Sequence, residues 1–355
     1  MNAVKLEDSL QSINGLDRLS FDKAQKRLDN LTKPLGSLGK LEDIVKQLAG
    51  INKNEFPVVD KKAIVIMCAD NGVTDEGVSS CPKSVTASVT RNFTRGITGV
   101  NTLSRHSGAD IVVVDIGVDD NIACNGVVNR KIRKGTSNMA REAAMSRQEA
   151  IQAIETGIDM VCELAKKGYN LLGTGEMGIG NTSTSSAVAT VLTGSTVEEM
   201  VGRGAGLSNE GLKHKIEVIK KSIDINLPDP ADPIDVVAKV GGFDIAGLAG
   251  CFIGAAACRI PILIDGFISA VAALVAVRLK PEVKAFLLPS HGSAEPGNKT
   301  VMAELGFEPF LNLDMRLGEG TGAALGFHII DAAVAAYMNM GTFEDASITQ
   351  YEPQE

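Results

Sequence analysis

The sequence contains no tryptophan, and aromatic residues make up only 4% of its 355 positions. Its six cysteines form no C-x-x-C pair, and its four histidines are far apart. This spacing gives little support to a structural zinc site, and scattered cysteines of this kind are typically small buried hydrophobes. We therefore expect free thiols and no bound metal. The cysteines occupy positions 68, 81, 124, 162, 251 and 258.

Clusters of positive charge and long apolar runs are also missing. The net charge is −8 and no dense group of lysines and arginines occurs, which argues against nucleic-acid binding. No stretch approaches the roughly 18 uninterrupted apolar residues that a membrane helix needs. The opening MNAVKLEDSLQSINGL lacks the basic and apolar regions of a secretory signal. We expect a cytoplasmic protein that binds neither nucleic acid nor membranes.

The sequence does have ample apolar residues, 44% of the total, arranged in short runs. Six such runs alternate with helix-like segments, which predicts a parallel sheet covered on both faces. We therefore predict an α/β fold that is Rossmann-like and doubly wound, with a mainly parallel six-stranded sheet. Ligands of such folds bind at the carboxyl ends of strands. The runs span residues 63–70, 111–118, 169–175, 260–266, 285–292 and 310–315.

The two ends of the chain differ from this pattern. Residues 17–31 and 40–51 have apolar positions at helical spacing. No low-complexity linker or internal repeat divides the remainder. We predict a small helical lobe from residues 1–60 plus 332–355, and a large α/β domain over residues 61–331.

A glycine-rich loop, GTGEMGIGNTS, follows the third predicted strand and opens a helix. It contains G-x-G-x-x-G, but a dinucleotide site also requires an acidic residue about 20 positions later, after a second strand. Glu198 and Glu199 have that spacing, yet STVEEM indicates the start of a helix. A mononucleotide phosphate or ribose at the helix N-terminus explains the glycines as well. Tight packing of strand against helix is a third interpretation.

Charged residues near other loops have two interpretations each. Arg203 in VGRGAGLS and Lys215 on the next helix are candidate phosphate ligands, although a solvated helix face is the simpler interpretation for each. Asp70, Asp75 and Glu76 follow the first strand and could be an acid and a base, or a solvated loop.

The segment LPSHGSAEPG places Ser290, His291 and Ser293 close together in sequence, which suggests a nucleophile and its base. Adjacent residues seldom hydrogen-bond in the geometry that this chemistry needs, and no G-x-S-x-G motif occurs. The hydroxyls and backbone N–H groups here could instead hold a substrate carboxylate.

The segment LNLDMRLGEGTGAAL, residues 311–325, places Glu319 among glycines. Such glycines usually let backbone N–H groups reach a phosphate, but a carboxylate would repel it. Poor solvation beside Leu317 and Ala323 would raise the pKa of Glu319 toward the range of a general base. A carboxylate that caps the following helix is equally consistent with the pattern.

Eight segments, taken in chain order, resemble a known enzyme family. No single segment is specific, but together they cover residues 20–340 or so. The chain resembles the nicotinate-nucleotide–dimethylbenzimidazole phosphoribosyltransferases, which make the lower ligand of cobalamin. The segments are KPLGSLGKLE, CADNGVTDEGV, TRGITGV, GTGEMGIGNTS, VGGFDIAGL, PILIDGFIS, PSHGSAE and MRLGEGTGAAL.

The resemblance implies a Rossmann-like domain, a small lobe from both termini, and a homodimer whose subunits complete each other's active sites. It also implies the reaction. Nicotinate mononucleotide and a benzimidazole-type base, such as 5,6-dimethylbenzimidazole, would give α-ribazole 5'-phosphate and nicotinate. These small molecules are the expected partners, and no cofactor is required.

The resemblance also assigns site residues. Glu319 would be the general base and Glu176 a second carboxylate near the reacting centre. Ser293 would meet the nicotinate carboxylate, while the other implied residues bind phosphate or ribose or line the site. They are Gly175, Gly178, Gly180, Asn181, Gly204, Lys215, Asp265, Gly266 and Leu317.

The sequence differs from many members of that family in the segment that contacts the base. Those members have a serine and, eight residues later, a glutamine, whereas this chain has Cys81 and Val89. Asn71 and Gly292 replace a more common histidine and aromatic residue. Smaller and less polar residues imply a roomier acceptor pocket, so other benzimidazoles, a purine or a phenol are further candidate acceptors.

Overall fold

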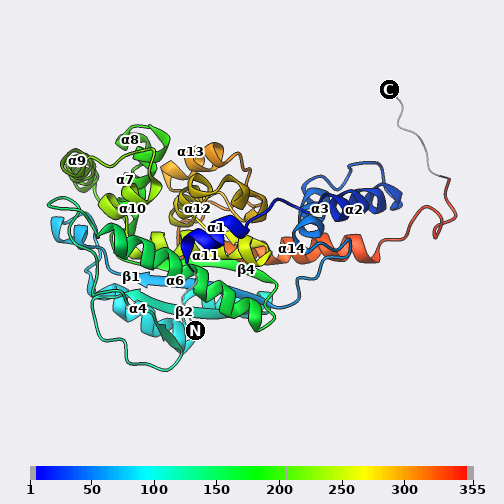
Figure 1. Ribbon diagram of the computed structural model, residues 1–355, viewed down its shortest axis with the longest axis horizontal. Coiled ribbons are helices and arrows are strands. Elements are labelled where there is room, and N and C mark those ends of the chain that lie inside the picture. Colours follow the sequence, from blue (N-terminus) through cyan, green and yellow to red (C-terminus); the bar gives the residue numbers. More distant parts are fainter. Residues whose placement is uncertain (1–4, 205, 350–355) are drawn as a thin grey trace.

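A single six-stranded sheet forms the centre of the computed structural model, which describes residues 5–204 and 206–349 (Figure 1). The strand order is β3-β2-β1-β4-β5-β6, and every neighbouring pair is parallel. This is the order of a doubly wound fold and confirms the predicted fold class. The strands are β1 (Lys62–Ala69), β2 (Ala109–Gly117), β3 (Val127–Asn129), β4 (Leu171–Met177), β5 (Ile262–Ile264) and β6 (Leu287–Pro289).

Five of the six predicted strands are present, and the predicted strand at 310–315 is wrong. Leu311 makes only an isolated bridge with His291, and residues 312–314 are exposed. Asn312 and Asp314 interrupt the apolar pattern, so this segment has no continuous apolar face to bury. The sixth strand is β3, whose three residues are too few to give a recognisable pattern.

Alternate residues of β1 face two separate cores. Ala63, Val65 and Met67 pack in one core with helices α6 (Arg147–Lys166), α11 (Phe243–Cys258) and α12 (Phe267–Leu279). Ile64 and Ile66 pack in the other core with α4 (Ser84–Arg95), α5 (Gly99–Ser107) and α14 (Thr321–Asn339). Because both faces are covered, every residue of β1 is buried, which explains its unbroken apolar run.

A second group of helices surrounds α7, which follows β4 (Figure 1). Helices α8, α9, α10 and α13 all contact α7. They form a wall beside the carboxyl ends of the strands. Their bounds are α7 (Asn181–Thr193), α8 (Val197–Met200), α9 (Asn209–Asn226), α10 (Pro233–Val240) and α13 (Pro296–Leu305), and the 3-10 helices are η1 (Gly72–Glu76) and η2 (Pro281–Phe286).

Segments from both ends of the chain meet at one end of the molecule. Helices α2 (Arg18–Asn30) and α3 (Lys40–Asn52) lie beside the distal half of α14 (Figure 1). The Tyr337 hydroxyl donates to the Glu55 carbonyl at 2.9 Å. Helix α1 (Leu6–Ser12) packs elsewhere, against α6 and α11. The lobe boundaries stay predictions, and residues 1–4 and 350–355 of the predicted lobe lie outside the described residues.

Helix α14 is long and apolar enough to cross a membrane by length and composition, although His328 and Asp331 interrupt it. Half of this apolar stretch is buried inside the protein. Phe327 and Ile330 belong to the core beside the sheet, and Asp331 pairs with Lys62 of β1 at 2.6 Å. Packing of α14 against the sheet accounts for its apolar character.

Glycines allow α6 and α11 to approach each other closely. A Cβ atom on Gly157 would lie 1.9 Å from the Gly247 carbonyl oxygen, and one on Gly250 would lie 1.9 Å from the Ile154 carbonyl oxygen. Both obstacles are backbone atoms in buried helices, so neither can move aside cheaply.

We predict that Gly157→Ala destabilises the protein by about 1–3 kcal/mol, because the added methyl group forces the two helices apart. Urea unfolding followed by circular dichroism measures this change. Gly15→Ala is the matched control, since a Cβ there would meet nothing within 4 Å. Equal stability of the two variants would show that the close helix contact is not required.

Candidate active site

A cavity of about 290 Å³ lies at the carboxyl ends of β4, β5 and β6. The strand order reverses between β1 and β4, and this is where doubly wound folds bind ligands. Three consecutive strand ends and the loop before α14 supply most of the wall. The main lining segments are residues 176–182, 265–269 and 316–319.

Most of the predicted site residues line this cavity, although their roles stay predictions. Gly175 lies behind the wall, where a Cβ atom would be 2.3 Å from the Glu319 carbonyl oxygen. Cys81 does not line the cavity, but its N–H donates to Ser79 Oγ at 3.2 Å, and Ser79 does line it. The predicted residues in the wall are Val89, Glu176, Gly178, Gly180, Asn181, Gly204, Asp265, Gly266, Ser293, Leu317 and Glu319.

Asp265 directly follows β5, and its buried carboxylate organises the start of α14. One oxygen accepts from the Gly320 N–H at 3.0 Å, and the other accepts from the Gly322 and Ala323 N–H groups at 2.7 and 3.2 Å. These N–H groups carry the positive end of the α14 dipole. Asp265 therefore caps this helix and fixes the loop that precedes it.

Glu319 occupies that loop with a φ of +63°, which is uncommon for a residue with a side chain. Its carboxylate turns toward the start of α5 and accepts from the Val100 N–H at 3.3 Å. It therefore does not cap the helix that follows it, the role that Asp265 takes. Burial raises the pKa of Glu319, the nearby charge of Asp265 raises it further, and the Val100 N–H counteracts both.

Glu176 is the penultimate residue of β4 and lies beside the Glu319 backbone. Its carboxylate accepts from the Asn181 side chain and from the Glu319 backbone N–H, the latter at 3.4 Å. Burial, together with the charges of Asp244 and Asp265, raises the pKa of Glu176 to about 8, against the Asn181 hydrogen bond. Glu176 is therefore mostly protonated at neutral pH in the empty site.

The opposite end of the cavity is cationic. The buried Lys215 ammonium donates to Thr182 Oγ1 at 2.8 Å, and Thr182 lines the cavity. Burial lowers the pKa of Lys215 to about 8, which still favours the charged ammonium at pH 7. Arg316 also lines the cavity and is exposed. The second glycine-rich loop, VGRGAGLS, completes this end and places Gly204 in the wall.

The cavity residues outside the predicted set include Ser79, Thr182, Glu295 and Arg316. Glu295 and Arg316 belong to the segments PSHGSAE and MRLGEGTGAAL, so a signal was available for both. Thr182 is the second residue of α7, directly after the glycines of GTGEMGIGNTS, which the sequence marks as a candidate phosphate site. No pattern in the sequence distinguishes Ser79 from its neighbours, because only the fold turns it toward the cavity.

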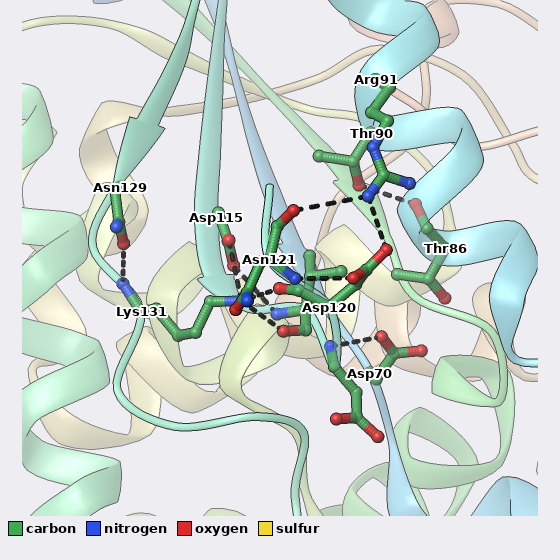
Figure 2. Close-up of polar contacts among 11 residues, drawn as sticks. Asp70, Thr86, Thr90, Arg91, Asp115, Asp120, Asn121, Asn129 and Lys131 are labelled. Atoms are coloured by element: carbon green, nitrogen blue, oxygen red, sulfur yellow. Dashed lines mark hydrogen bonds and ion pairs between the residues drawn. The ribbon is translucent and has the colours of Figure 1, made fainter. Parts of the chain in front are cut away.

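The carboxylates after β1 do not line the cavity. Figure 2 shows Asp70 in a network at the ends of β1 and β2, where it accepts from the Asp119 N–H at 2.8 Å. In the same network Lys131 pairs with Asp115 at 3.0 Å. Asp75 is exposed, and Glu76 pairs with Arg141 at 3.0 Å. These contacts favour a structural role for the loop rather than acid and base chemistry.

The candidate nucleophile Ser290 also has structural partners. Ser290 Oγ lies 3.2 Å from His291 Nδ1, closer than we expected for adjacent residues. Ser290 is nevertheless buried, and its hydroxyl donates to the Ile264 carbonyl at 2.6 Å, so it is not available as a nucleophile.

The acidic residues considered for a dinucleotide site belong to α8. Glu199 caps this helix and Glu198 pairs with Lys220, so neither is presented to a ribose. Arg203 donates to the Leu207 carbonyl at 2.8 Å within its own loop. Within residues 5–204 and 206–349, no group of three His, Cys, Asp or Glu side chains could hold a metal ion.

Comparison with known proteins gives a consistent result. A family model described as phosphoribosyltransferase matches residues 13–348. The nicotinate-nucleotide–dimethylbenzimidazole phosphoribosyltransferase of Acetivibrio thermocellus is 70% identical over 98% of this chain and 99% of its own length. Its counterpart in Ruminiclostridium cellulolyticum is 69% identical over the same shares. The crystal structure of CobT from Thermus thermophilus superposes with a TM-score of 0.90 at 35% identity, covering 94% of this chain and all of that one.

The protonated state of Glu176 leads to a prediction on stability. Its pKa is raised from 4.5 when unfolded to about 8 when folded, so the folded state holds a proton that the unfolded state releases. This contribution is full below pH 4.5 and is lost as the pH rises to about 8. We predict that the free energy of unfolding falls by a few kcal/mol between pH 5 and pH 9, part of it through the other buried carboxyls.

Glu176→Gln should make this fall smaller, because the amide does not titrate. Guanidinium unfolding at several pH values measures the slope. The exposed Glu344→Gln is the control and should leave the slope as in the unmodified protein. An unchanged slope for Glu176→Gln would mean that Glu176 is already ionised in the folded protein.

Proposed function

The chain belongs to the nicotinate-nucleotide–dimethylbenzimidazole phosphoribosyltransferase family, and we propose that it transfers the phosphoribosyl group of nicotinate mononucleotide to 5,6-dimethylbenzimidazole or a related base. The products are α-ribazole 5'-phosphate, used for the lower ligand of cobalamin, and nicotinate. The observation that carries this proposal is a cavity with a buried carboxyl, Glu176, and a half-buried one, Glu319, at one end and cations at the other.

This charge distribution matches the donor. Its phosphate suits the end formed by Lys215, Thr182 and Arg316, where a buried ammonium and a guanidinium are close by. The ribose then extends toward Glu176 and Glu319. The positively charged pyridinium and the anomeric carbon lie nearest these carboxyls, and Ser293 in the wall offers a hydroxyl to the nicotinate carboxylate.

In this reaction the protein must activate the nucleophile, whereas the leaving group needs no acid catalyst. When the bond from the anomeric carbon to the pyridinium nitrogen breaks, nicotinate takes the electron pair and leaves without needing a proton. The incoming base attacks through one ring nitrogen and becomes cationic unless its other nitrogen loses a proton. Attack from the opposite face inverts the anomeric configuration from β to α. A carboxylate beside the second nitrogen would accept that proton.

Glu319 suits this role better than Glu176. A base must be ionised before it can accept a proton, and Glu176 is mostly protonated in the empty site because its pKa is about 8. Glu319 is less deeply buried and receives the Val100 N–H, which favours its ionised form. The Glu319 backbone N–H donates to the Glu176 carboxylate, so Glu176 supports the loop that presents Glu319. A bound pyridinium would favour ionisation of Glu176 as well. The ionised Glu176 carboxylate would then stabilise positive charge that develops on the ribose.

On the side of the cavity near α4, Val89 supplies an apolar side chain to the wall and Ser79 supplies a hydroxyl. Both lie before or within α4, on the side that would face an incoming aromatic ring. We propose that this wall admits 5,6-dimethylbenzimidazole and tolerates other flat bases, since few polar groups here select among ring substituents. Competition among benzimidazoles, purines and phenols would rank them.

We also propose that the chain acts as a cytoplasmic homodimer with a small helical lobe beside the catalytic domain. Leu317 in the cavity wall is 60% exposed and Ile97, two residues before α5, is 59% exposed. A second subunit placed over these side chains would bury them and close the mouth of the cavity. All six cysteines are free, which suits a reducing compartment.

The proposed activity predicts a defined pair of products. Incubation with nicotinate mononucleotide and 5,6-dimethylbenzimidazole should give α-ribazole 5'-phosphate and nicotinate in equal amounts, measured by chromatography. Binding of the mononucleotide without product would indicate a nucleotide-binding carrier. Fluorescence evidence of NADH binding, without nicotinate release, would indicate an oxidoreductase.

Glu319→Gln should bind the donor normally but lose turnover by a factor of about 100 or more, because the amide cannot accept the proton. Donor affinity measured by calorimetry and kcat measured by chromatography separate these effects. Glu308→Gln, an exposed residue outside the cavity, is the control. Near-normal kcat in Glu319→Gln would transfer the role of base to Glu176 or to water.

A further inference from the structure

Glu295 places a carboxylate at the cationic end of the cavity, where the proposed phosphate of the donor would bind and where a second negative charge would repel it. It precedes α13, is 8% exposed, and lines the cavity together with Arg316. Its Oε2 atom is fully buried and has no hydrogen-bond partner among the described residues. Its carboxylate does not cap α13 either. A buried polar atom without a partner is costly, so this oxygen calls for an explanation.

The groups that face Glu295 are all cationic. Lys215 comes from α9 and Arg316 from the loop before α14, and both favour its ionised form. Arg203, from the loop before α9, shares with Glu295 the lining of a neighbouring cavity of about 390 Å³. No cation lies within 4 Å of Glu295 in the part of the chain that the structure describes, so these charges act across a gap.

Glu295 also lies against the second glycine-rich loop, VGRGAGLS, at Gly202. A Cβ atom on Gly202 would be 1.8 Å from Glu295 Oε2 and 2.8 Å from Pro296 Cδ, so this carboxylate packs directly against the glycine backbone. The Lys215 ammonium approaches the Gly202 carbonyl oxygen at 3.4 Å and donates to Thr182 Oγ1. Glu295, Lys215 and the cavity wall at Thr182 and Gly204 therefore surround the same small volume.

The geometry points to Glu295 as a proton-coupled phosphate-binding residue: it is the counterion of Lys215 and Arg316 in the empty site, and it takes up a proton when the donor phosphate binds. The protonated carboxyl then donates a hydrogen bond to a phosphate oxygen. This inference rests on the proposed function, because it takes the donor to be a phosphorylated riboside.

Electrostatics requires a response of this kind. A phosphate monoester carries roughly −1.5 to −2 charges at pH 7. An ionised carboxylate beside it in a poorly solvated cavity would oppose binding, whereas a carboxyl group with a proton supplies a donor. Burial already raises the pKa of Glu295, against the pull of Lys215 and Arg316. A phosphate bound in the site would raise the pKa of this carboxyl further.

Calorimetry can count the proton. Binding of nicotinate mononucleotide at pH 7 is measured in buffers of different ionisation enthalpy, and the slope gives the number of protons taken up. The protein should take up more protons than Glu295→Gln, by up to about one per site. Donor affinity should also fall with rising pH, by up to about tenfold per unit, and should fall less in Glu295→Gln. Lys215 is present in both proteins, so its contribution largely cancels.

Nicotinate riboside, which lacks the phosphate, is the matched control ligand and should bind the unmodified protein without this extra proton. That comparison holds even if Glu295→Gln fails to fold. Equal proton uptake in the protein and in Glu295→Gln, or equal uptake with the mononucleotide and the riboside, would overturn the inference. If α-ribazole 5'-phosphate still forms in that case, only the role of Glu295 fails. If neither donor binding nor product is detected, the proposed function fails with it.

Discussion

The carboxylate of Asp265 fixes the start of α14, and the geometry of the cavity depends on that contact. Asp265 directly follows the buried strand β5, so its position is set by the sheet, and its two oxygens accept three backbone N–H groups from the start of the helix. Burial raises the pKa of Asp265, and those hydrogen bonds counteract part of that effect. They also hold the preceding loop in a turn in which Glu319 has a positive φ. The strain at Glu319 is sustained because the sheet and the helix determine both sides of the turn.

The cavity has two chemically different ends. At one end Glu176 and Glu319 are bridged through a backbone N–H, and burial keeps a proton on Glu176. At the other end Lys215 is buried and bonded to Thr182. A ligand with an anion at one end and a cation at the other fits this arrangement in one direction only. Orientation of the donor would therefore come from charge, and proximity of two planar rings to one ribose would supply much of the rate.

The sheet was readable from the sequence because buried parallel strands are unbroken apolar runs, as β1 shows. A three-residue edge strand such as β3 leaves no such pattern, and the apolar positions at 310–315 belong to an exposed loop instead. Glu319 was recognised by its glycine neighbours, but the helix that its carboxylate contacts was not, since α5 lies over 200 residues away. Glu295 lies in the recognised segment PSHGSAE, but the sequence does not show its proximity to Lys215, because only the folded chain brings α9 to that segment.

The central claim is that the Glu319 carboxylate accepts a proton from the incoming base. A crystal structure of the protein with 5,6-dimethylbenzimidazole and a non-reacting donor analogue tests it most directly. The account predicts a Glu319 carboxylate oxygen about 2.6–3.2 Å from the ring nitrogen that carries the proton, with the other nitrogen facing the anomeric carbon. A Glu319 side chain that points away from the ring, with another group bonded to that nitrogen, would contradict it.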